Sequence, residues 1–345
     1  MTVAALGTLM ESEMREQPYV LAALADRFTA IGSEVAALFH TQPPAGVAFL
    51  ARGSSDNAAL LGRYAIELHT GLPTCLVAPS LATAYGREPT GFRNWLLIAL
   101  SQSGHTPEIV DLTHRYAAAG ARVVAVTNAP DSPLSNAAHY TVPLDAGPEL
   151  AVPATKTVTA QMLAVLALAA GLAPNGMSAR EAAELPSAAA HLLDYPTGVD
   201  AAAHLLSTVD RAAVVGRSAC YPAALETALK LQETTGLLAH GFSTADFRHG
   251  PIAVTGPTTP TVLLAGSGPA DTDTLNLRAT LKSRRSPIIL AGTSINADLP
   301  WPPQAHLADC LLATIRGQQL ALSLSRHLAL NPDHPTGLHK VTLTH

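Results

Sequence analysis

The chain has 345 residues, of which 48% are hydrophobic and 14% are charged, and its formal net charge is -5. The length suggests about two domains, and the composition excludes a largely disordered chain. The acidic balance gives no basic footprint for nucleic acid, and the longest apolar run, at 162–172, is too short to span a membrane. No basic start precedes an apolar segment as in a signal peptide, and three scattered cysteines form no CxxC pair. We therefore expect a cytoplasmic protein without disulfides.

The first part of the chain predicts helices and strands in alternation. Residues 2–40 have an amphipathic helical pattern with a break at Pro18, which suits either packing against the core or a dimer arm. Short apolar runs without polar interruption then predict strands that are buried on both faces, and helical patterns follow them. These predicted strands are 47–51, 95–100, 123–126 and 141–144, with a long buried helix from Pro153 onward.

The second part of the chain repeats this alternation. The stretch 171–196 is rich in Ala, Pro, Gly and short polar residues and is predicted to link two halves. Further strands are predicted at 212–215, 261–265 and 287–291, with helices from Pro222 and at 316–328. We predict an α/β protein with two tandem, homologous αβα halves and parallel sheets, which bind ligands at the carboxyl ends of the strands. The expected domains are 1–40, 41–175, 176–330 and the tail 331–345.

Two turns that follow predicted strands are rich in hydroxyl and amide side chains and contain no lysine. Such groups, with backbone N–H groups at helix N-termini, can surround an anion such as a phosphate monoester. The same residue types suit tight turns and helix caps, so a purely structural role stays open. The chain has no GxxxxGKS/T or GxGxxG motif, which disfavours nucleoside triphosphates and dinucleotides. The candidate donors are Ser54, Ser55, Ser101, Gln102, Ser103 and Thr106.

A stripe of ionisable residues lies on the helix that follows Pro222. Glu226, Lys230 and Glu233 are spaced i, i+4 and i+7, which places them on one helix face. The stripe is either a solvated rim with weak surface pairs or the wall of a pocket. A polar loop from Gly241 to Pro251 follows the helix and favours the pocket.

Two further residues are candidates for chemistry. His249 stands in the polar loop after the charged helix, and Lys340 is the only lysine in the C-terminal tail. Lys340 is either a solvated terminal lysine or a catalytic one. The fourteen histidines form no HExxH motif and no Cys/His cluster, so we expect no metal and no cofactor.

Six short motifs together carry a resemblance to a known family. They are ARGSS at 51–55, SQSG-x-T at 101–106, PATK at 153–156, YPAALETALKLQE at 221–233, FRHGP at 247–251 and LHKVT at 338–342. In this combination the chain resembles the sugar isomerase (SIS) superfamily. It is most similar to the isomerase half of glucosamine-6-phosphate synthase and to stand-alone relatives that deaminate amino-sugar phosphates. The resemblance extends from about Glu11 to the C-terminus.

The resemblance implies a role for each candidate residue. The six donors of the two turns would bind the sugar phosphate. Glu233 matches the glutamate that moves a proton, and His249 matches the ring-opening histidine, which the family contributes across a dimer interface. Lys340 matches the lysine near the sugar carbonyl. Val152, Ala154 and Lys230 would make further contacts to the substrate.

The expected reaction is the conversion of glucosamine 6-phosphate, or a close relative, to fructose 6-phosphate and ammonia by a homodimeric enzyme. The alternatives are a ketose/aldose phosphate isomerase, a fructosamine-phosphate deglycase, and a non-catalytic sugar-phosphate sensor. The chain departs from the synthase at Ala154, where the synthase has a hydroxyl residue, at His105, where it has glutamate, and at Gln232, where it has lysine. Because the sequence goes directly from Met1 to the SIS part, we expect no release of ammonia from glutamine.

Overall fold

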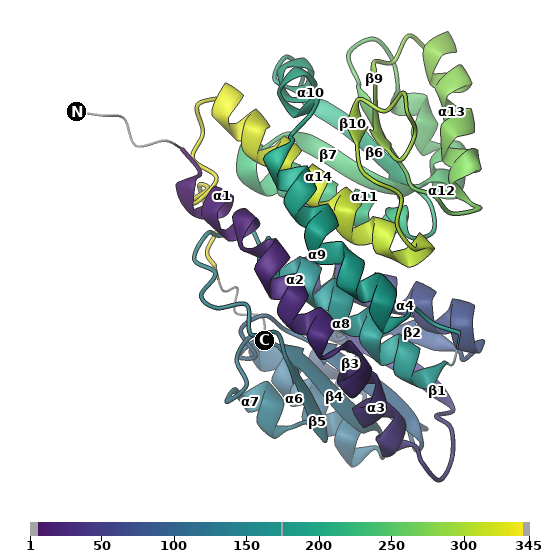
Figure 1. Cartoon of the computed structure of the whole chain (residues 1–345). Coiled ribbons are helices and arrows are strands. Elements are labelled where there is room, and N and C mark those ends of the chain that lie inside the picture. The colour runs from purple at the N-terminus through teal and green to yellow at the C-terminus, as the bar shows by residue number, and fades with distance from the viewer. Residues whose placement is uncertain (1–5, 174, 341–345) are drawn as a thin grey trace. The chain divides into compact units, whose positions relative to one another are not determined.

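The computed structural model describes residues 6–173 and 175–340, and the chain divides into two compact units (Figure 1). The N-half unit consists of residues 20–148 and 157–183. The C-half unit consists of the described residues up to Tyr19, of 149–156 and of 184–340. Each unit is therefore assembled from stretches that are separate in the sequence. The predicted domains were single continuous stretches, and their boundaries stay a prediction.

The N-half unit contains a parallel sheet with the strand order β2-β1-β3-β4-β5. All residues of β1 are buried, as expected for a strand covered on both faces. The strands are β1 (Gly46–Leu50), β2 (Thr74–Leu76), β3 (Trp95–Leu100), β4 (Arg122–Thr127) and β5 (Tyr140–Pro143). The helices are α3 (Phe28–Leu38), α4 (Ser54–Thr70), α5 (Ser80–Thr83), α6 (Pro107–Ala118), α7 (Pro133–Asn136) and α8 (Lys156–Leu172), of which α8 begins in the C-half unit.

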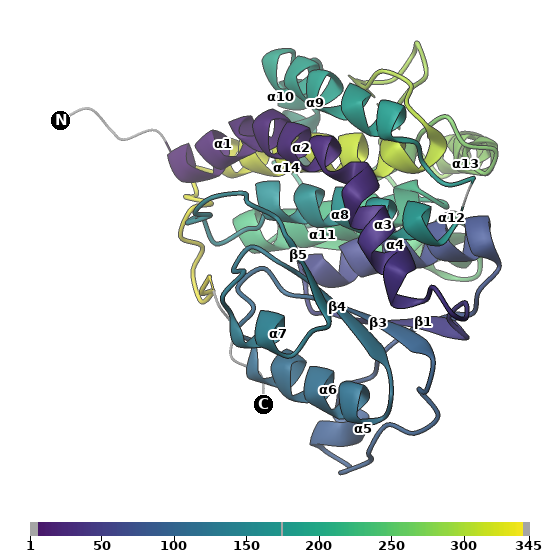
Figure 2. The ribbon, with the colours of Figure 1, turned by 60° about the horizontal axis from the view of Figure 1, so that its bottom comes forward.

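Helices cover both faces of this sheet (Figure 2). On one face, Ala48 and Leu50 of β1 pack in a cluster with Ile109 and Leu112 of α6. On the other face, the Phe49 ring lies so close to α4 that a Cβ at Gly62 would stand 2.6 Å from it. The alternation of side chains along β1 thus builds two separate layers of core.

The C-half unit repeats the arrangement, with the strand order β10-β9-β8-β6-β7 in a second parallel sheet. Its strands are β6 (Arg211–Gly216), β7 (Leu238–Ser243), β8 (Thr261–Ala265), β9 (Ile288–Gly292) and β10 (Leu299–Pro300). Counted along the chain within each half, both sheets have the order 2-1-3-4-5, which is that of flavodoxin-like doubly wound folds. The predicted pair of α/β halves with parallel sheets is confirmed.

Several helices lie in the C-half unit. They are α1 (Thr8–Arg15), α10 (Val199–Leu206), α11 (Cys220–Thr235), α12 (Thr244–Arg248), α13 (Asp271–Ser283), α14 (Asp309–His327) and two short 3-10 helices at Pro251–Val254 and His306–Ala308. Two further helices, α2 (Gln17–Asp26) and α9 (Ala179–Asp194), run from one unit into the other. Helices α11 and α14 cross closely, because a Cβ at Gly317 would stand 2.1 Å from the Thr227 hydroxyl oxygen.

Two predictions about local structure are wrong, the break at Pro18 and the loop after α11. The N-terminal helical region, whose first residues up to Ala5 lie outside the described residues, breaks after Arg15 and again after Asp26, while Pro18 lies in the first turn of α2, where proline is tolerated. The stretch 171–196 contains α9, because its alanines favour helix more than its Pro186 disfavours it, and its use as a link between the halves stays a prediction. The predicted loop after α11 contains β7 and α12.

The helix predicted at 316–328 begins earlier, at Asp309. In the part of the chain that the structure describes, none of the helices has the length and apolarity needed to cross a membrane.

Candidate active site

The hydroxyl-rich turns of the N-half unit follow two neighbouring strands. Strands β1 and β3 pair in parallel, and both turns begin at their carboxyl ends. In the 2-1-3-4-5 order, the direction in which successive strands are added to the sheet reverses at this pair, which is the place where doubly wound sheets bind ligands. Helix α4 begins at Ser54, directly after the first turn, and α6 begins at Pro107, directly after the second. The two turns therefore present two helix N-termini at one edge of the sheet.

Local hydrogen bonds fix the second turn. The Ser101 hydroxyl accepts a bond from the Gly104 N–H at 3.2 Å, and the Ser103 hydroxyl accepts one from the His105 N–H at 3.2 Å. Gly104 has a φ of 65°, and a Cβ there would stand 2.1 Å from the Ser132 hydroxyl oxygen. Only glycine fits this position, so the tight turn is a requirement of the fold.

Other hydroxyls at these turns remain available to a ligand. Within the described residues, the hydroxyl groups of Ser54, Ser55 and Thr106 make no hydrogen bond to another residue. The nearby guanidinium of Arg52 is held by the buried Glu108 carboxylate, with N–O distances of 2.9 and 3.1 Å. An anion would therefore meet neutral donors and helix N-termini, which attract negative charge.

The corresponding turn of the C-half unit is closed by carboxylates of the chain itself. One oxygen of Asp309 accepts bonds from both the N–H and the hydroxyl of Ser267, each at 2.7 Å. The other oxygen accepts a bond from the Trp301 indole at 3.1 Å. Asp271 accepts the Gly268 N–H at 2.8 Å. The Ser267 hydroxyl and the N–H groups of this turn are thus engaged by protein groups, unlike the hydroxyls of Ser54, Ser55 and Thr106.

The charged stripe on α11 is buried. Lys230 and Glu226 are almost fully shielded from water and stand 3.5 Å apart, and Lys230 also pairs with Glu233, whose side chain is 23% exposed. Burial alone would lower the pKa of Lys230, but the carboxylates of Glu226, Glu233 and Glu149 together raise it above its ordinary value. A solvated helix rim is thereby excluded, and Lys230 is a cation enclosed by acids.

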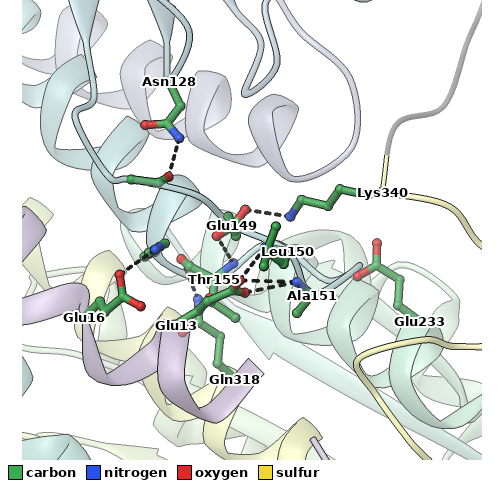
Figure 3. Close-up of polar contacts among 12 residues, drawn as sticks. Glu13, Glu16, Asn128, Glu149, Leu150, Ala151, Thr155, Glu233, Gln318 and Lys340 are labelled. Carbon is green, nitrogen blue, oxygen red and sulfur yellow. Dashed lines mark hydrogen bonds and ion pairs between the residues drawn. The ribbon is translucent and has the colours of Figure 1, made fainter. Parts of the chain in front are cut away.

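A second ion pair joins the tail to the segment 149–156. Lys340 donates to one oxygen of Glu149 at 2.8 Å, and the other oxygen accepts the Thr155 N–H at 2.9 Å (Figure 3). The Glu149 side chain is fully buried, whereas Lys340 is 22% exposed. Glu149 also interacts electrostatically with Lys230. The carboxylate of Glu149 therefore lies within the influence of both lysines.

Helix α1 holds the same segment in place. Glu13 accepts bonds from the N–H groups of Leu150 and Ala151, and Glu16 pairs with Lys156 at 2.6 Å (Figure 3). Burial, offset by these backbone bonds and reinforced by the charge of Glu149, raises the pKa of Glu13. Of the two uses predicted for the N-terminal region, packing against the core is therefore the one seen in this unit.

The segment that α1 supports carries two of the predicted substrate contacts. Val152 is half-buried and donates its N–H to the Asp333 carbonyl at 3.2 Å. Ala154 is half-buried as well. The Asp333 carboxylate accepts the N–H groups of Leu9 and Met10 at the start of α1, at 3.1 and 2.8 Å. Hydrogen bonds thus join the tail, the segment 149–156 and helix α1 to one another.

His249 lies at the other end of α11 from Glu233. Helix α11 leads from the carboxyl end of β6 back to the amino end of β7, and His249 follows β7 and α12 at the carboxyl edge. At that edge the Thr244 hydroxyl donates to the Gly216 carbonyl at 3.3 Å. Between Cys220 and Glu233 the helix advances 233 − 220 = 13 residues, or about 20 Å at about 1.5 Å per residue. The structure brings Glu233 and Lys230 together, but it does not bring His249 to them.

Glu149 and Glu13 were not predicted from the sequence. Neither residue belongs to a periodic stripe or to one of the six motifs. The available signal was a single carboxylate, Glu149, in a stretch of small and apolar residues from Ala146 to Thr155 directly before PATK.

Known proteins share both the sequence pattern and the fold. The family model of the SIS domain matches residues 45–171 and 205–307. The glutamine–fructose-6-phosphate aminotransferase of Zymomonas mobilis is 30% identical over 356 aligned residues, which cover 96% of this chain and 58% of that protein. The enzyme of the same name from Halobacterium salinarum is 31% identical over 352 residues, with the same coverage. The chain therefore spans little more than half the length of these relatives.

Solved structures extend the comparison. A crystal structure from Silicibacter pomeroyi, described as that of a candidate phosphosugar isomerase, has 28% identity and a TM-score of 0.84, covering 94% of this chain and 99% of that one. Glucosamine-6-phosphate deaminase from Thermotoga maritima has 22% identity and a TM-score of 0.81, covering 98% and 100%, and shows the same fold. With a repeated 2-1-3-4-5 topology and two matched segments that together span most of its length, the chain belongs to the SIS domain family.

Proposed function

We propose that the chain is a phosphosugar isomerase that converts an amino-sugar phosphate, such as glucosamine 6-phosphate, to the ketose phosphate and ammonia. The observation that carries this proposal is the enclosed set of acids and amines in the C-half unit, in which Lys230 pairs with Glu226 and Glu233 and Lys340 pairs with Glu149. Buried groups of opposite charge that face one another are typical of sites for proton transfer.

The turns of the N-half unit would bind the phosphate. Their hydroxyls and helix N-termini suit a phosphate monoester. The curated relatives are named for reactions of fructose 6-phosphate, which carries such a phosphate.

Glu233 would move the proton. In the open-chain sugar it would remove the proton from C2 and deliver it to C1, so that the aldehyde becomes an alcohol and the amine at C2 becomes an imine. Water then hydrolyses the imine to the ketone and ammonia. Because C1 and C2 are adjacent, one carboxylate can serve both carbons. Lys340 would hold the open chain or form a Schiff base with it.

His249 would open the sugar ring from a second copy of the chain. Within one chain it lies at the opposite end of α11 from Glu233, about 20 Å away along the helix axis. A histidine that acts at the same sugar must therefore come from a partner, which supports a homodimer whose sites each use residues of both copies.

A panel of aldose, ketose and amino-sugar phosphates tests the proposal, with ammonia, ketose phosphate and solvent deuterium in the sugar measured for each. We expect ammonia and ketose phosphate in equal amounts from one amino-sugar phosphate. Deuterium exchange without ammonia would identify a ketose/aldose isomerase, and ammonia-free cleavage of a fructosamine phosphate would identify a deglycase. Binding without exchange would identify a sensor and refute the enzyme.

A further inference from the structure

We propose that Glu149 is a positioning residue that holds Lys340 for the reaction, an inference that rests on the proposed function. The two residues lie 191 positions apart in the sequence, and their ion pair is the contact by which the Lys340 amine is attached to the C-half unit. Neither the sequence motifs nor the periodicity of the chain assigns a role to Glu149.

The Glu149 carboxylate is held in place by contacts that do not involve Lys340. One oxygen of Glu149 accepts the Thr155 N–H at 2.9 Å, within the same segment, and the other accepts the Lys340 amine at 2.8 Å. The segment itself is held by Glu13 of α1 through the N–H groups of Leu150 and Ala151. The acceptor is therefore rigid, and the oxygen that accepts the Lys340 amine has a defined direction.

The donor, in contrast, comes from a part of the chain with little structure of its own. After α14 ends at His327, residues 328–340 form no helix or strand. The tail is attached by the Val152 N–H to the Asp333 carbonyl and by the Asp333 carboxylate to α1. These contacts lie seven residues before Lys340, so they do not set the position of a flexible lysine side chain.

The charge of Glu149 also fits this role better than a purely structural one. Its carboxylate interacts with Lys230 as well as with Lys340, and it raises the pKa of the nearby Glu13. A buried carboxylate is retained at a cost in desolvation, and a neutral amide could bind the Thr155 N–H equally well. With a single acceptor oxygen and no charge, the amide could not at the same time accept the Lys340 amine and neutralise it.

The first test measures Lys340 directly and needs no substrate. In the full-length protein, the rate of Lys340 acylation by an amine-reactive ester is followed by mass spectrometry in the parent and in Glu149→Gln, with the exposed Lys282 as internal reference. We expect Lys340 to react at least about threefold faster in the variant and Lys282 to react equally. An equal Lys340 rate in a variant with the parent's melting temperature overturns the inference.

The second test asks whether Glu149 acts through Lys340. We expect Glu149→Gln to lower kcat about 10- to 100-fold, with KM changed less than about threefold, and to have no further effect when Lys340 is already Met. Glu16→Gln is the control, because Glu16 is another acid at the segment 149–156 but pairs with Lys156 instead of Lys340. This variant should leave kcat unchanged. If the losses of kcat caused by Glu149→Gln and by Lys340→Met multiply in the double variant, the inference is overturned. If Glu149→Gln does not fold, Glu149→Asp replaces it, because aspartate keeps the charge but shortens the reach to the Lys340 amine. The acylation rate of Lys340 in Glu149→Asp, and its kcat with and without Lys340→Met, then decide the inference by the same criteria.

The two proposals fail separately. An inactive parent on the whole panel refutes the proposed reaction, while the acylation rates still decide whether Glu149 holds Lys340.

Discussion

Replacement of Glu233 by glutamine should strongly slow the reaction while the protein stays folded. The substitution keeps the size of the side chain and a hydrogen bond to Lys230, and the Glu226 carboxylate remains 3.5 Å from the same amine. Lys230 therefore keeps a counter-charge, and we expect the free energy of unfolding to fall by only about 1–2 kcal/mol. A domain with about 5–15 kcal/mol of stability stays folded after such a loss. Removal of the base should nevertheless lower kcat by about 10²- to 10⁴-fold.

Glu226→Gln is the matched control, because Glu226 lies on the same helix face and pairs with the same lysine but is fully buried. We expect it to cost more stability and much less turnover than Glu233→Gln. The assay follows ammonia release and the uptake of solvent deuterium at C1, alongside denaturant unfolding of each variant. If Glu233→Gln exchanges deuterium as fast as the parent while Glu226→Gln does not, the assignment of the shuttle is refuted and Glu226 takes its place.

Four further changes test other parts of the structure. Ser103→Ala should raise KM for the sugar phosphate with little change in kcat, and an unaltered KM would remove the second turn from the phosphate site. An inactive Glu233→Gln chain mixed with an inactive His249→Asn chain should regain activity after exchange of subunits, since one site of the mixed dimer then has neither defect; no recovery would place both residues in one subunit's site. Glu13 has a raised pKa in the folded state, so the folded protein binds an extra proton above pH 4.5 and the free energy of unfolding falls as the pH rises toward that raised pKa. Glu13→Gln should remove this part of the slope, and an unchanged pH profile of the melting temperature would contradict the burial argument. Gly171→Ala would place a Cβ 2.0 Å from a carbonyl oxygen of α3 and should destabilise the N-half unit by about 1–3 kcal/mol in urea unfolding, whereas an unchanged midpoint would show that the helices can separate.

The sequence predicted those features that depend on short-range patterns. Strands such as β3 and β8 were predicted with the observed boundaries, because a strand covered on both faces is a short apolar run with clear ends. The shared face of Glu226 and Glu233 followed from helix periodicity alone. Strand β7 was missed because it lies at the sheet edge, where Leu238 and His240 are exposed and a glycine interrupts the pattern.

The missed part of the candidate site depends on contacts between distant segments. Glu149 meets Lys340 across 191 residues of sequence, and Glu13 meets Ala151 across 138. No local pattern encodes such pairs, because Glu13, Glu149 and Lys340 each look like an ordinary charge in their own segments. The position of His249 at the far end of α11 from Glu233 also became apparent only when the order of β6, α11 and β7 in space was known.

We expect the Asp309 carboxylate to make the two halves respond differently to an anion, although they share one topology. In the C-half turn it already satisfies the Ser267 donors, and its negative charge would repel a phosphate, so we expect one anion per chain rather than two. Asp309 is also the first residue of α14, so the same contact ties the turn to this helix. The turn is therefore held by the protein itself. Amide hydrogen exchange at 266–271 should therefore be slow in the free protein, whereas protection at 101–106 should rise when a sugar phosphate binds.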